Sequence, residues 1–220
     1  RRPLLWVELS SRNRATSSYS PTFCYELAAR RCDAAALAKL DLTCWRVAGV
    51  GGDMVRPNVL RTFAETFAPA GFDGDGLTVS YGRAEATLAL TYEPGLGLRT
   101  DTIDRDRLEH DAVAAPVGDH TERTREFAIC GRILPRHEAE IRDGHGRPLP
   151  ERAVGRIFVK GPSLMRGYFG EPDTTARVLS PDGWLDTGDL GYHLDNQLVV
   201  TGRAKDLIIR AGHNLHPEEL

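Results

Sequence analysis

An isolated aspartate and an arginine stand at the two ends of a short hairpin-like stretch of the sequence. Asp189 lies in Trp184-Leu185-Asp186-Thr187-Gly188-Asp189-Leu190-Gly191-Tyr192, and Arg203 opens the run Arg203-Ala204-Lys205-Asp206. A carboxylate accepts hydrogen bonds from two neighbouring sugar hydroxyls, and a guanidinium reaches the same sugar or an adjacent phosphate. The pair therefore predicts a nucleotide held at a domain edge. The alternative interpretation is that Asp189 only forms a glycine turn.

Two further turns carry residue types that suit a bound nucleotide. Gly51-Gly52-Asp53 follows an apolar run, and glycines at such a place let a flat ring approach the backbone. Tyr81-Gly82-Arg83-Ala84-Glu85 follows a β-type run, and strand-to-helix turns lie at the carboxyl edge of a parallel sheet, where α/β folds bind ligands. Each turn also has a purely structural interpretation, in which Asp53 or Glu85 caps the helix that follows.

The elements that would position these turns follow from the hydrophobic pattern of the first hundred residues. Short β-type runs alternate with helical runs, which predicts a mostly parallel sheet flanked by helices. The expected strands are 15–20, 45–52, which ends in glycines, and 77–80. One helix is expected over 22–31, with Phe23, Leu27 and Ala28 on its apolar side, and another begins at Pro57. The apolar stripe of this second helix consists of Val59, Leu60, Phe63, Ala64 and Phe67.

The character of the chain changes near residue 91. From 91 to 126 the sequence is polar and lacks an apolar face beyond a short strand near Thr100, and so long a connection within a domain is often functional. From 127 to 202 short β-type runs are separated by glycine and proline turns, which predicts a small antiparallel barrel. We thus divide the chain into part of an α/β subdomain (1–90), a polar insertion (91–126), a barrel-like subdomain (127–202), and a hinge with the start of a further domain (203–220).

The composition is that of an ordinary soluble protein, with 220 residues, 41% hydrophobic and 27% charged content, and a net charge of −3. This charge gives no reason to expect nucleic acid or an anionic membrane as a partner. The four cysteines show no CxxC spacing, so free thiols are expected and a metal site or disulfide framework is not. No apolar run approaches the ~18 residues of a membrane span, and the first residues lack a signal-peptide pattern, so the expected location is the cytoplasm.

The order of these motifs resembles that in the adenylate-forming enzymes of the acyl-CoA synthetase and luciferase superfamily. Within it the chain is most similar to the fatty acyl-AMP ligases. The resemblance runs from Ala15-Thr16-Ser17-Ser18-Tyr19-Ser20-Pro21 to Asn214-Leu215-His216-Pro217-Glu218-Glu219. The turn Tyr81-Gly82-Arg83-Ala84-Glu85-Ala86-Thr87 and the polar segment 91–126 favour this branch, whose insertion at that place restricts domain movement so that CoA is not used.

The resemblance implies an adenosine site built from distant parts of the chain. The residues that would bind the nucleotide are Gly51, Gly52, Asp53, Tyr81, Gly82, Asp189 and Arg203. The glycine turn would line the adenine pocket, and Tyr81 would stack on or pack beside the adenine. Asp189 would bind both ribose hydroxyls, and Arg203 would contact ribose or phosphate.

The resemblance also implies roles outside adenosine binding. Glu85 would be the catalytic residue that helps hold Mg²⁺ against the phosphates, and Lys205 would be the hinge about which a C-terminal domain rotates. Arg83 departs from the family, which usually has an apolar residue there. If Arg83 faces the acyl pocket, it would shorten or polarise that pocket.

The implied reaction joins a fatty-acid carboxylate to the α-phosphate of ATP, expels pyrophosphate, and passes the acyl group to the phosphopantetheine arm of an acyl carrier protein. Two anions must meet, so catalysis rests on positioning and on cations. The family's phosphate loop would lie before residue 1, and its C-terminal domain would lie beyond Leu220. We therefore expect this central piece alone not to adenylate a substrate.

Three other interpretations stay open from the sequence. They are an acyl-CoA ligase, an amino-acid adenylation domain, and a non-catalytic relict that binds at most a nucleotide or a partner. The relict gains weight from Asn13, Cys24, Arg83 and Pro135-Arg136, which stand where the family usually has other residues.

Overall fold

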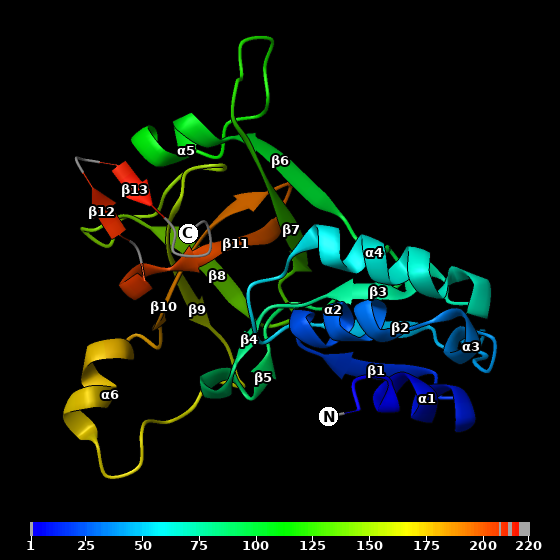
Figure 1. Ribbon diagram of the computed structural model, residues 1–220. Helices are drawn as coiled ribbons and strands as arrows, with labels where there is room; N and C mark the ends of the chain where they lie inside the picture. Colours follow the sequence, from blue (N-terminus) through cyan, green and yellow to red (C-terminus); the bar gives the residue numbers. More distant parts are fainter. Residues whose placement is uncertain (1, 207, 211–212, 216–220) are drawn as a thin grey trace.

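Figure 1 shows the computed structural model, which describes residues 2–206, 208–210 and 213–215. The first part of the chain forms a parallel sheet whose three described strands follow the order β1-β2-β3. The strands are β1 (Ser17–Ser20), β2 (Val47–Val50) and β3 (Leu77–Val79). The helices are α1 (Leu5–Arg12), α2 (Thr22–Arg31), α3 (Ala34–Leu37) and α4 (Pro57–Phe67). This arrangement is the predicted helix-flanked parallel sheet.

The core of this part is an aromatic cluster centred on α4. Phe63 is fully buried, and its ring centroid lies 4.8 Å from that of Tyr25 on α2 and 4.6 Å from that of Phe67. The stripe expected on α4 does face the interior, because Val59, Leu60, Phe63 and Phe67 are all buried. Burying one such side chain contributes roughly 1.5–3 kcal/mol, so this stripe fixes α4 and the turn before it.

The bounds of α2 are right, but its predicted apolar face is right only for Ala28 and wrong for Phe23 and Leu27. Phe23 and Leu27 are 51% and 42% exposed, whereas Tyr25 and Ala28 are fully buried. The buried face follows Tyr25 because its hydroxyl donates to the carbonyl of Gly49 on β2, at 2.9 Å. A polar-tipped tyrosine can thus take the inward position, and the purely apolar residues turn outward.

The second part of the chain is an antiparallel sheet of six described strands in the order β6-β7-β11-β10-β9-β8. Its strands are β6 (Thr100–Asp104), β7 (Thr124–Arg132), β8 (Glu138–Arg142), β9 (Gly155–Lys160), β10 (Leu185–Leu194) and β11 (Gln197–Arg203). The barrel expected for 127–202 is not closed, because β6 and β8 remain the two edges of the described sheet. Alternating exposure along a strand does not specify whether the outer strands meet, so the sequence could not distinguish an open sheet from a barrel.

Part of the polar segment 91–126 is built into this sheet. β6 pairs with β7 along its whole length, from Thr100 opposite Ala128 to Asp104 opposite Thr124. It is followed by α5 (Arg105–Asp111), which the sequence analysis did not expect. Asp104 caps α5 by accepting from the backbone of Arg107 at 3.0 Å. The helix escaped prediction because its buried members are one leucine, Leu108, and one ion-paired carboxylate.

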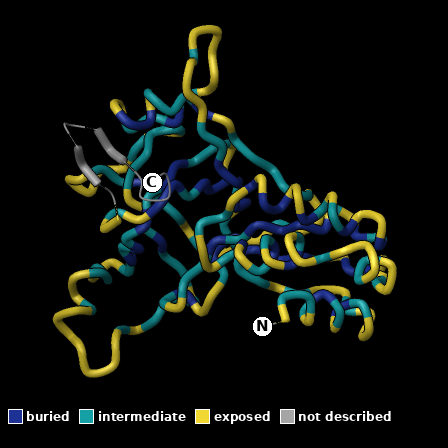
Figure 2. Tube along the Cα trace, viewed as in Figure 1, coloured by how far each residue is buried: buried dark blue, intermediate teal, exposed yellow. Residues whose placement is uncertain are grey.

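The remaining elements connect or border the two sheets (Figure 1). They are the short ribbon of β4 (Gly82–Arg83) and β5 (Leu88–Ala89), the helix α6 (Pro172–Val178), and the ribbon of β12 (Ile208–Arg210) and β13 (His213–Leu215). Figure 2 shows that burial is concentrated in the strands of both sheets, whereas α6 and the loop before it are largely exposed. The ribbon β4–β5 directly follows Tyr81 and carries Gly82, which is one of the predicted site residues.

Candidate nucleotide-binding cleft

A cleft of about 780 Å³ lies where the parallel part meets the antiparallel sheet. Its walls include the turns after β2 and β3 and the paired strands β10 and β11. The predicted site residues on these walls are Gly52, Asp53, Tyr81, Gly82, Glu85, Asp189, Arg203 and Lys205. The structure thus brings together every predicted site residue except Gly51.

Asp189 lies at the centre of this cleft. It is 6% exposed and stands directly opposite Arg203 in the pairing of β10 with β11. Its Oδ2 accepts from the Tyr81 hydroxyl at 2.7 Å and from Nη1 of Arg83 at 2.9 Å. Its Oδ1 lies 3.7 Å from Nε of Arg203, too far for a hydrogen bond. The charge of Asp189 is therefore compensated mainly through Oδ2, while Oδ1 keeps acceptor capacity.

A bulge in β10 presents Asp189 to the cleft. Asp186 pairs with Phe158 of β9 and Leu190 with Arg156, so the three residues between them have a single residue opposite on β9. Gly188 takes a φ of +71°, which a residue with a side chain adopts only with strain. Asp189 was expected in a turn, and it lies instead inside a strand whose regular pairing is interrupted.

Thr187 holds this bulge in place. Its hydroxyl donates to the carbonyl of Ile157 at 2.7 Å and accepts from the backbone of Asp189 at 3.1 Å. Thr187 is buried, so this small network is shielded from water. The threonine of the Thr-Gly-Asp sequence therefore fixes the backbone on which the carboxylate sits.

Tyr81 follows β3 and is 9% exposed. Its backbone amide donates to the hydroxyl of Thr91 at 2.8 Å, and its carbonyl accepts from the amides of Leu90 and Thr91. Burial, and then the negative charge of Asp189, raise the pKa of Tyr81 far above its ordinary value. The phenol therefore stays protonated and donates to Asp189 at any physiological pH.

Glu85 lies on a single 3-10 turn, Ala84–Ala86, where the sequence predicted the start of a longer helix. Nε and Nη2 of Arg83 donate to its Oε2 and Oε1 at 3.2 and 3.3 Å, and the hydroxyl of Tyr168 donates to Oε1 at 2.8 Å. Burial alone would raise the pKa of Glu85, but the hydrogen bonds from Arg83 and Tyr168 outweigh it and lower the pKa below the ordinary value. Glu85 is thus an ionised carboxylate directed toward the cleft.

Arg83 does not line an acyl pocket that is separate from these carboxylates. Its guanidinium joins Asp189 to Glu85, and its side chain is 26% exposed. Burial would lower the pKa of Arg83, yet its bonds to Glu85 and Asp189 raise it. The group is therefore a permanent cation between the two carboxylates.

The turn Gly51-Gly52-Asp53 contributes less directly than predicted. A Cβ on Gly51 would lie 2.8 Å from the carbonyl oxygen of Ser80, so this glycine makes room for the neighbouring chain, and it does not line the cleft. Asp53 does not cap α4, whose N-cap is Arg56. Its Oδ1 accepts from the amide and the hydroxyl of Thr22 at 3.1 and 3.0 Å, which ties the start of α2 to this turn.

Gly82 also makes room for backbone. A Cβ there would lie 1.6 Å from the carbonyl oxygen of Leu88, so only glycine lets β4 and β5 pair at this point. Gly82 therefore serves the ribbon that carries Arg83. Arg203 and Lys205 are both exposed at the rim of the cleft.

Sequence reasoning missed Tyr168, which lies in the loop between β9 and α6. The same loop also binds the turn that carries Glu85. The backbone amide of Met165 donates to the Glu85 carbonyl at 2.7 Å, and the hydroxyl of Thr87 donates to the Ser163 carbonyl at 2.8 Å. The order of the motifs gave the only available signal, and it carried no information on contacts.

The cleft also has an apolar wall, which the sequence analysis did not identify. It consists of Met54, Val55, Ala128, Cys130 and Val200. Burial raises the pKa of the Cys130 thiol to about 12, so this cysteine is an uncharged part of the wall. The wall can contact the flat face of a ring or an aliphatic group.

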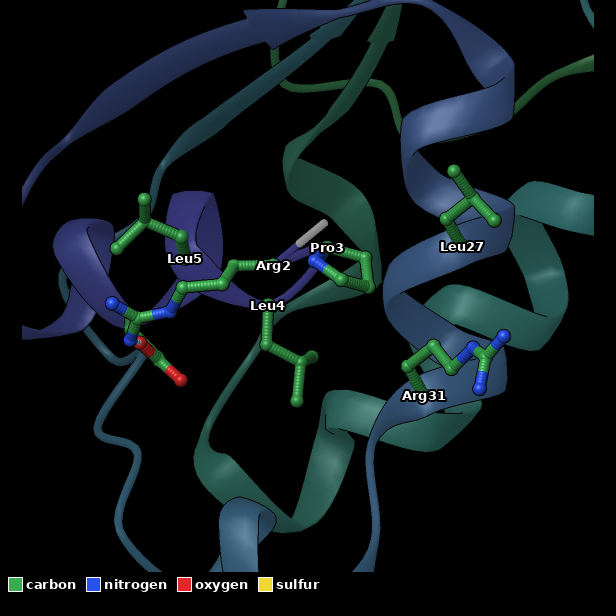
Figure 3. Close-up of a pocket in the computed structure, with 7 residues that line it drawn as sticks. Arg2, Pro3, Leu4, Leu5, Leu27 and Arg31 are labelled. Atoms are coloured by element: carbon green, nitrogen blue, oxygen red, sulfur yellow. Dashed lines mark hydrogen bonds and ion pairs between the residues drawn. The ribbon is translucent and has the colours of Figure 1, made fainter.

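A second cavity, of about 520 Å³, lies between the start of α1 and the end of α2 (Figure 3). Leu4, Leu5 and Leu27 line it together with Arg2 and Arg31. It contains none of the predicted site residues and brings no carboxylate near a second titratable group except Glu8, which pairs with Arg2 at 3.0 Å. The predicted site residues on cavity walls therefore all line the larger cleft.

The described residues contain no cluster of three or more His, Cys, Asp or Glu side chains arranged to hold a metal ion. None of the helices formed by the described residues has both the length and the apolarity to cross a membrane.

Comparison with known proteins identifies the family of the chain. The AMP-binding enzyme family matches residues 1–169. A protein of Caulobacter vibrioides named "Putative acyl-CoA synthetase" is 56% identical over the whole chain, and the medium-chain-fatty-acid–[acyl-carrier-protein] ligase JamA of Moorena producens is 35% identical over the whole chain.

A solved structure from work on fatty acyl-adenylate ligases of E. coli and L. pneumophila superposes with a TM-score of 0.96 at 46% identity. The superposition covers 99% of this chain and 40% of the chain in that structure. The chain spans 39% of the length of each of the two curated relatives. On the family match and on the cleft that unites its motifs, the chain belongs to the AMP-binding enzymes.

Proposed function

We propose that the chain forms the adenosine-binding part of an ATP-dependent fatty acyl-AMP ligase. The observation that supports this most strongly is that Tyr81, Glu85, Asp189 and Arg203 share one cleft although more than a hundred positions separate the first from the last. The similarity to fatty acyl-adenylate ligases and to a ligase that acts with an acyl carrier protein supports the substrate class.

In this proposal the cleft binds the nucleotide from its ribose. Asp189 accepts the two ribose hydroxyls, and its Oδ1, which lies 3.7 Å from Nε of Arg203, has acceptor capacity left for one of them. Tyr81 packs beside the adenine, and the turn of Gly52 and Asp53 lies at the same cleft wall. Arg203 and Lys205 stand at the rim, where Arg203 would reach ribose or phosphate and Lys205 would serve as the hinge.

The proposed reaction forms a mixed anhydride between a fatty-acid carboxylate oxygen and the α-phosphorus of ATP, while the bond from the α-phosphorus to the α,β-bridging oxygen breaks and pyrophosphate leaves. The thiol of a phosphopantetheine arm on an acyl carrier protein then attacks the acyl carbon, so that a thioester forms, the acyl–phosphate C–O bond breaks and AMP leaves. Glu85 is the residue that would hold Mg²⁺, since Mg²⁺ is commonly bound by one carboxylate together with substrate phosphates. When bound, the cation would neutralise charge on the departing pyrophosphate.

A second candidate is an acyl-CoA ligase, because the relative at 56% identity carries that name. The polar segment 91–126 favours the acyl-AMP branch in our proposal, since β6 and α5 anchor it to the antiparallel sheet. The two candidate functions can be distinguished with a protein that contains the whole enzyme. It is incubated with ATP, a medium-chain fatty acid and either CoA or a phosphopantetheinylated carrier protein, and the acylated product is identified. Acyl-CoA as the main product would exclude our choice of branch. A cytoplasmic location is proposed with the function.

Adenosine binding by this chain tests the nucleotide site itself. We expect isothermal titration calorimetry to show binding that Asp189→Asn weakens at least about tenfold, because hydrogen bonds to a charged acceptor contribute ~1.5–3 kcal/mol each and the amide keeps one neutral acceptor. Asp186→Asn is the matched control, as Asp186 lies on the same strand, pairs with Arg156 at 3.0 Å and does not line the cleft. Equal losses in both variants, or no loss in Asp189→Asn, would contradict the proposal.

A further inference from the structure

Arg83 occupies the position that a ribose needs. Its Nη1 and the Tyr81 hydroxyl both donate to Oδ2 of Asp189, at 2.9 and 2.7 Å. A carboxylate oxygen has two acceptor positions, so these two donors fill Oδ2. A ribose diol that binds both oxygens of Asp189 can therefore enter only if Arg83 withdraws from Oδ2.

The rest of the Arg83 side chain is attached elsewhere, so Nη1 can withdraw without releasing the whole group. Nε and Nη2 donate to Glu85 at 3.2 and 3.3 Å, which is the long end of the hydrogen-bond range. Tyr168 also donates to Glu85, at 2.8 Å, and keeps that carboxylate partly compensated if Arg83 shifts. The guanidinium can thus keep its two hydrogen bonds to Glu85 when Nη1 leaves Asp189.

We propose that Arg83 is an exchangeable cation that pairs with Asp189 in the empty cleft and with the phosphate of a bound nucleotide once the ribose has taken Asp189. This inference rests on the proposed nucleotide site. A phosphate attached to the ribose lies one sugar away from the diol, and the Arg83 guanidinium already reaches from Asp189 toward Glu85. The planar guanidinium pairs with phosphate through two parallel bonds, which is stronger than its present single bond to Asp189.

The exchange makes a specific prediction about ligand choice. A nucleoside alone must displace Arg83 from Asp189 and offers it nothing in return. A nucleoside 5′-monophosphate offers the displaced guanidinium a new anion. The cleft should therefore prefer AMP to adenosine, and Arg83 should account for most of that preference. A fixed structural ion pair would give no such dependence.

The experiment compares dissociation constants for AMP and adenosine, measured by calorimetry on the 220-residue chain. In the native chain we expect AMP to bind at least about tenfold more tightly, which corresponds to ~1.4 kcal/mol. Arg83→Gln should bring the ratio of the two constants close to one, with adenosine bound at least as tightly as before. Arg156→Gln is the control, because Arg156 lines the same cleft but pairs with Asp186, and it should keep the native ratio.

The outcomes separate this inference from the function on which it rests. If adenosine binds in an Asp189-dependent manner and Arg83→Gln keeps the native ratio, the exchange is wrong and the nucleotide site stands. If the native chain binds neither ligand, both fail. If Arg83→Gln does not fold, as judged by thermal melting, Arg83→Lys carries the test. It retains a cation but lacks the planar fork, so an undiminished AMP preference in that variant would overturn the proposal.

Discussion

The hydroxyl of Tyr81 provides a measurable test of the cleft, because the chain contains a second copy of the same arrangement outside it. Tyr81 donates to Asp189 at 2.7 Å beside Arg83, and Tyr192 donates to Asp101 at 2.6 Å beside an arginine, Arg152, at 3.1 Å. Both tyrosines are buried. Tyr81→Phe and Tyr192→Phe each remove one hydroxyl and leave the ring and the arginine in place.

The expected cost follows from what remains around the carboxylate. A hydrogen bond to a charged group contributes ~1.5–3 kcal/mol, and the arginine that stays bound to the same oxygen places the loss near the lower end, about 1.5 kcal/mol. In a chain of this size such a loss lowers the melting temperature by roughly 3–6 °C. Urea denaturation and thermal melting at pH 7 should give this loss for both variants.

A double-mutant cycle shows whether the loss comes from the bond to Asp189. Once Asp189→Asn has removed the charged acceptor, Tyr81→Phe should cost much less than it does alone, with a coupling energy of about 1 kcal/mol. Tyr192→Phe should cost the same in either background. The reasoning is refuted if the effects of Tyr81→Phe and Asp189→Asn add to within ~0.5 kcal/mol, which is the expectation for independent sites.

Three further measurements test other parts of the structure. The pKa of Glu85 is lowered in the folded state, so its ionised form stabilises the fold at pH values above the ordinary pKa of 4.5. In urea melts the native chain should have a higher free energy of unfolding than Glu85→Gln at pH 6 and lose this difference as the pH falls through the folded-state pKa. A difference that stays constant with pH would contradict the ion pair. Gly82→Ala puts a Cβ against the Leu88 carbonyl and should destabilise the chain by at least ~1–3 kcal/mol in the same assay, and an unchanged midpoint would exclude the close approach. Hydrogen bonds from the backbone of Arg147 lower the pKa of Asp143 to about 2, so its carboxyl ¹³C shift should titrate near pH 2, and a midpoint near 4 would show that the turn after β8 is open.

The sequence predicted those parts of the fold in which local signals agree. Proline at the start of α4 and the spacing of Val59, Leu60, Phe63 and Phe67 specified both the helix and its buried face. The face of α2 was missed because Tyr25 enters the core by bonding to a backbone carbonyl, which a count of apolar residues does not register. Whether the second sheet closes could not be predicted either. The local alternation of apolar and polar residues does not indicate whether two distant edge strands pair.

The candidate site could be predicted as a set of positions but not as a network. Motif order placed Tyr81, Glu85 and Asp189 in one cleft, and the structure brings them there. It could not give the direction of Arg83, because a long side chain after a turn can face either the ring-binding side or the carboxylates. It also gave no hint of Tyr168, which reaches Glu85 from a loop that the sequence separates from it by 83 positions.

The interrupted pairing of β10 has a consequence for how this region can vary. Exposure alternates from Leu185 to Gly191, and then the adjacent Tyr192 is buried as well, so one strand supplies side chains to two separate cores. Removing or adding a single residue beside Gly188 would exchange inward and outward positions on one side of the irregularity. We therefore infer that homologous chains have no insertions or deletions beside Gly188. Less buried positions such as Leu190 should accept different residue types.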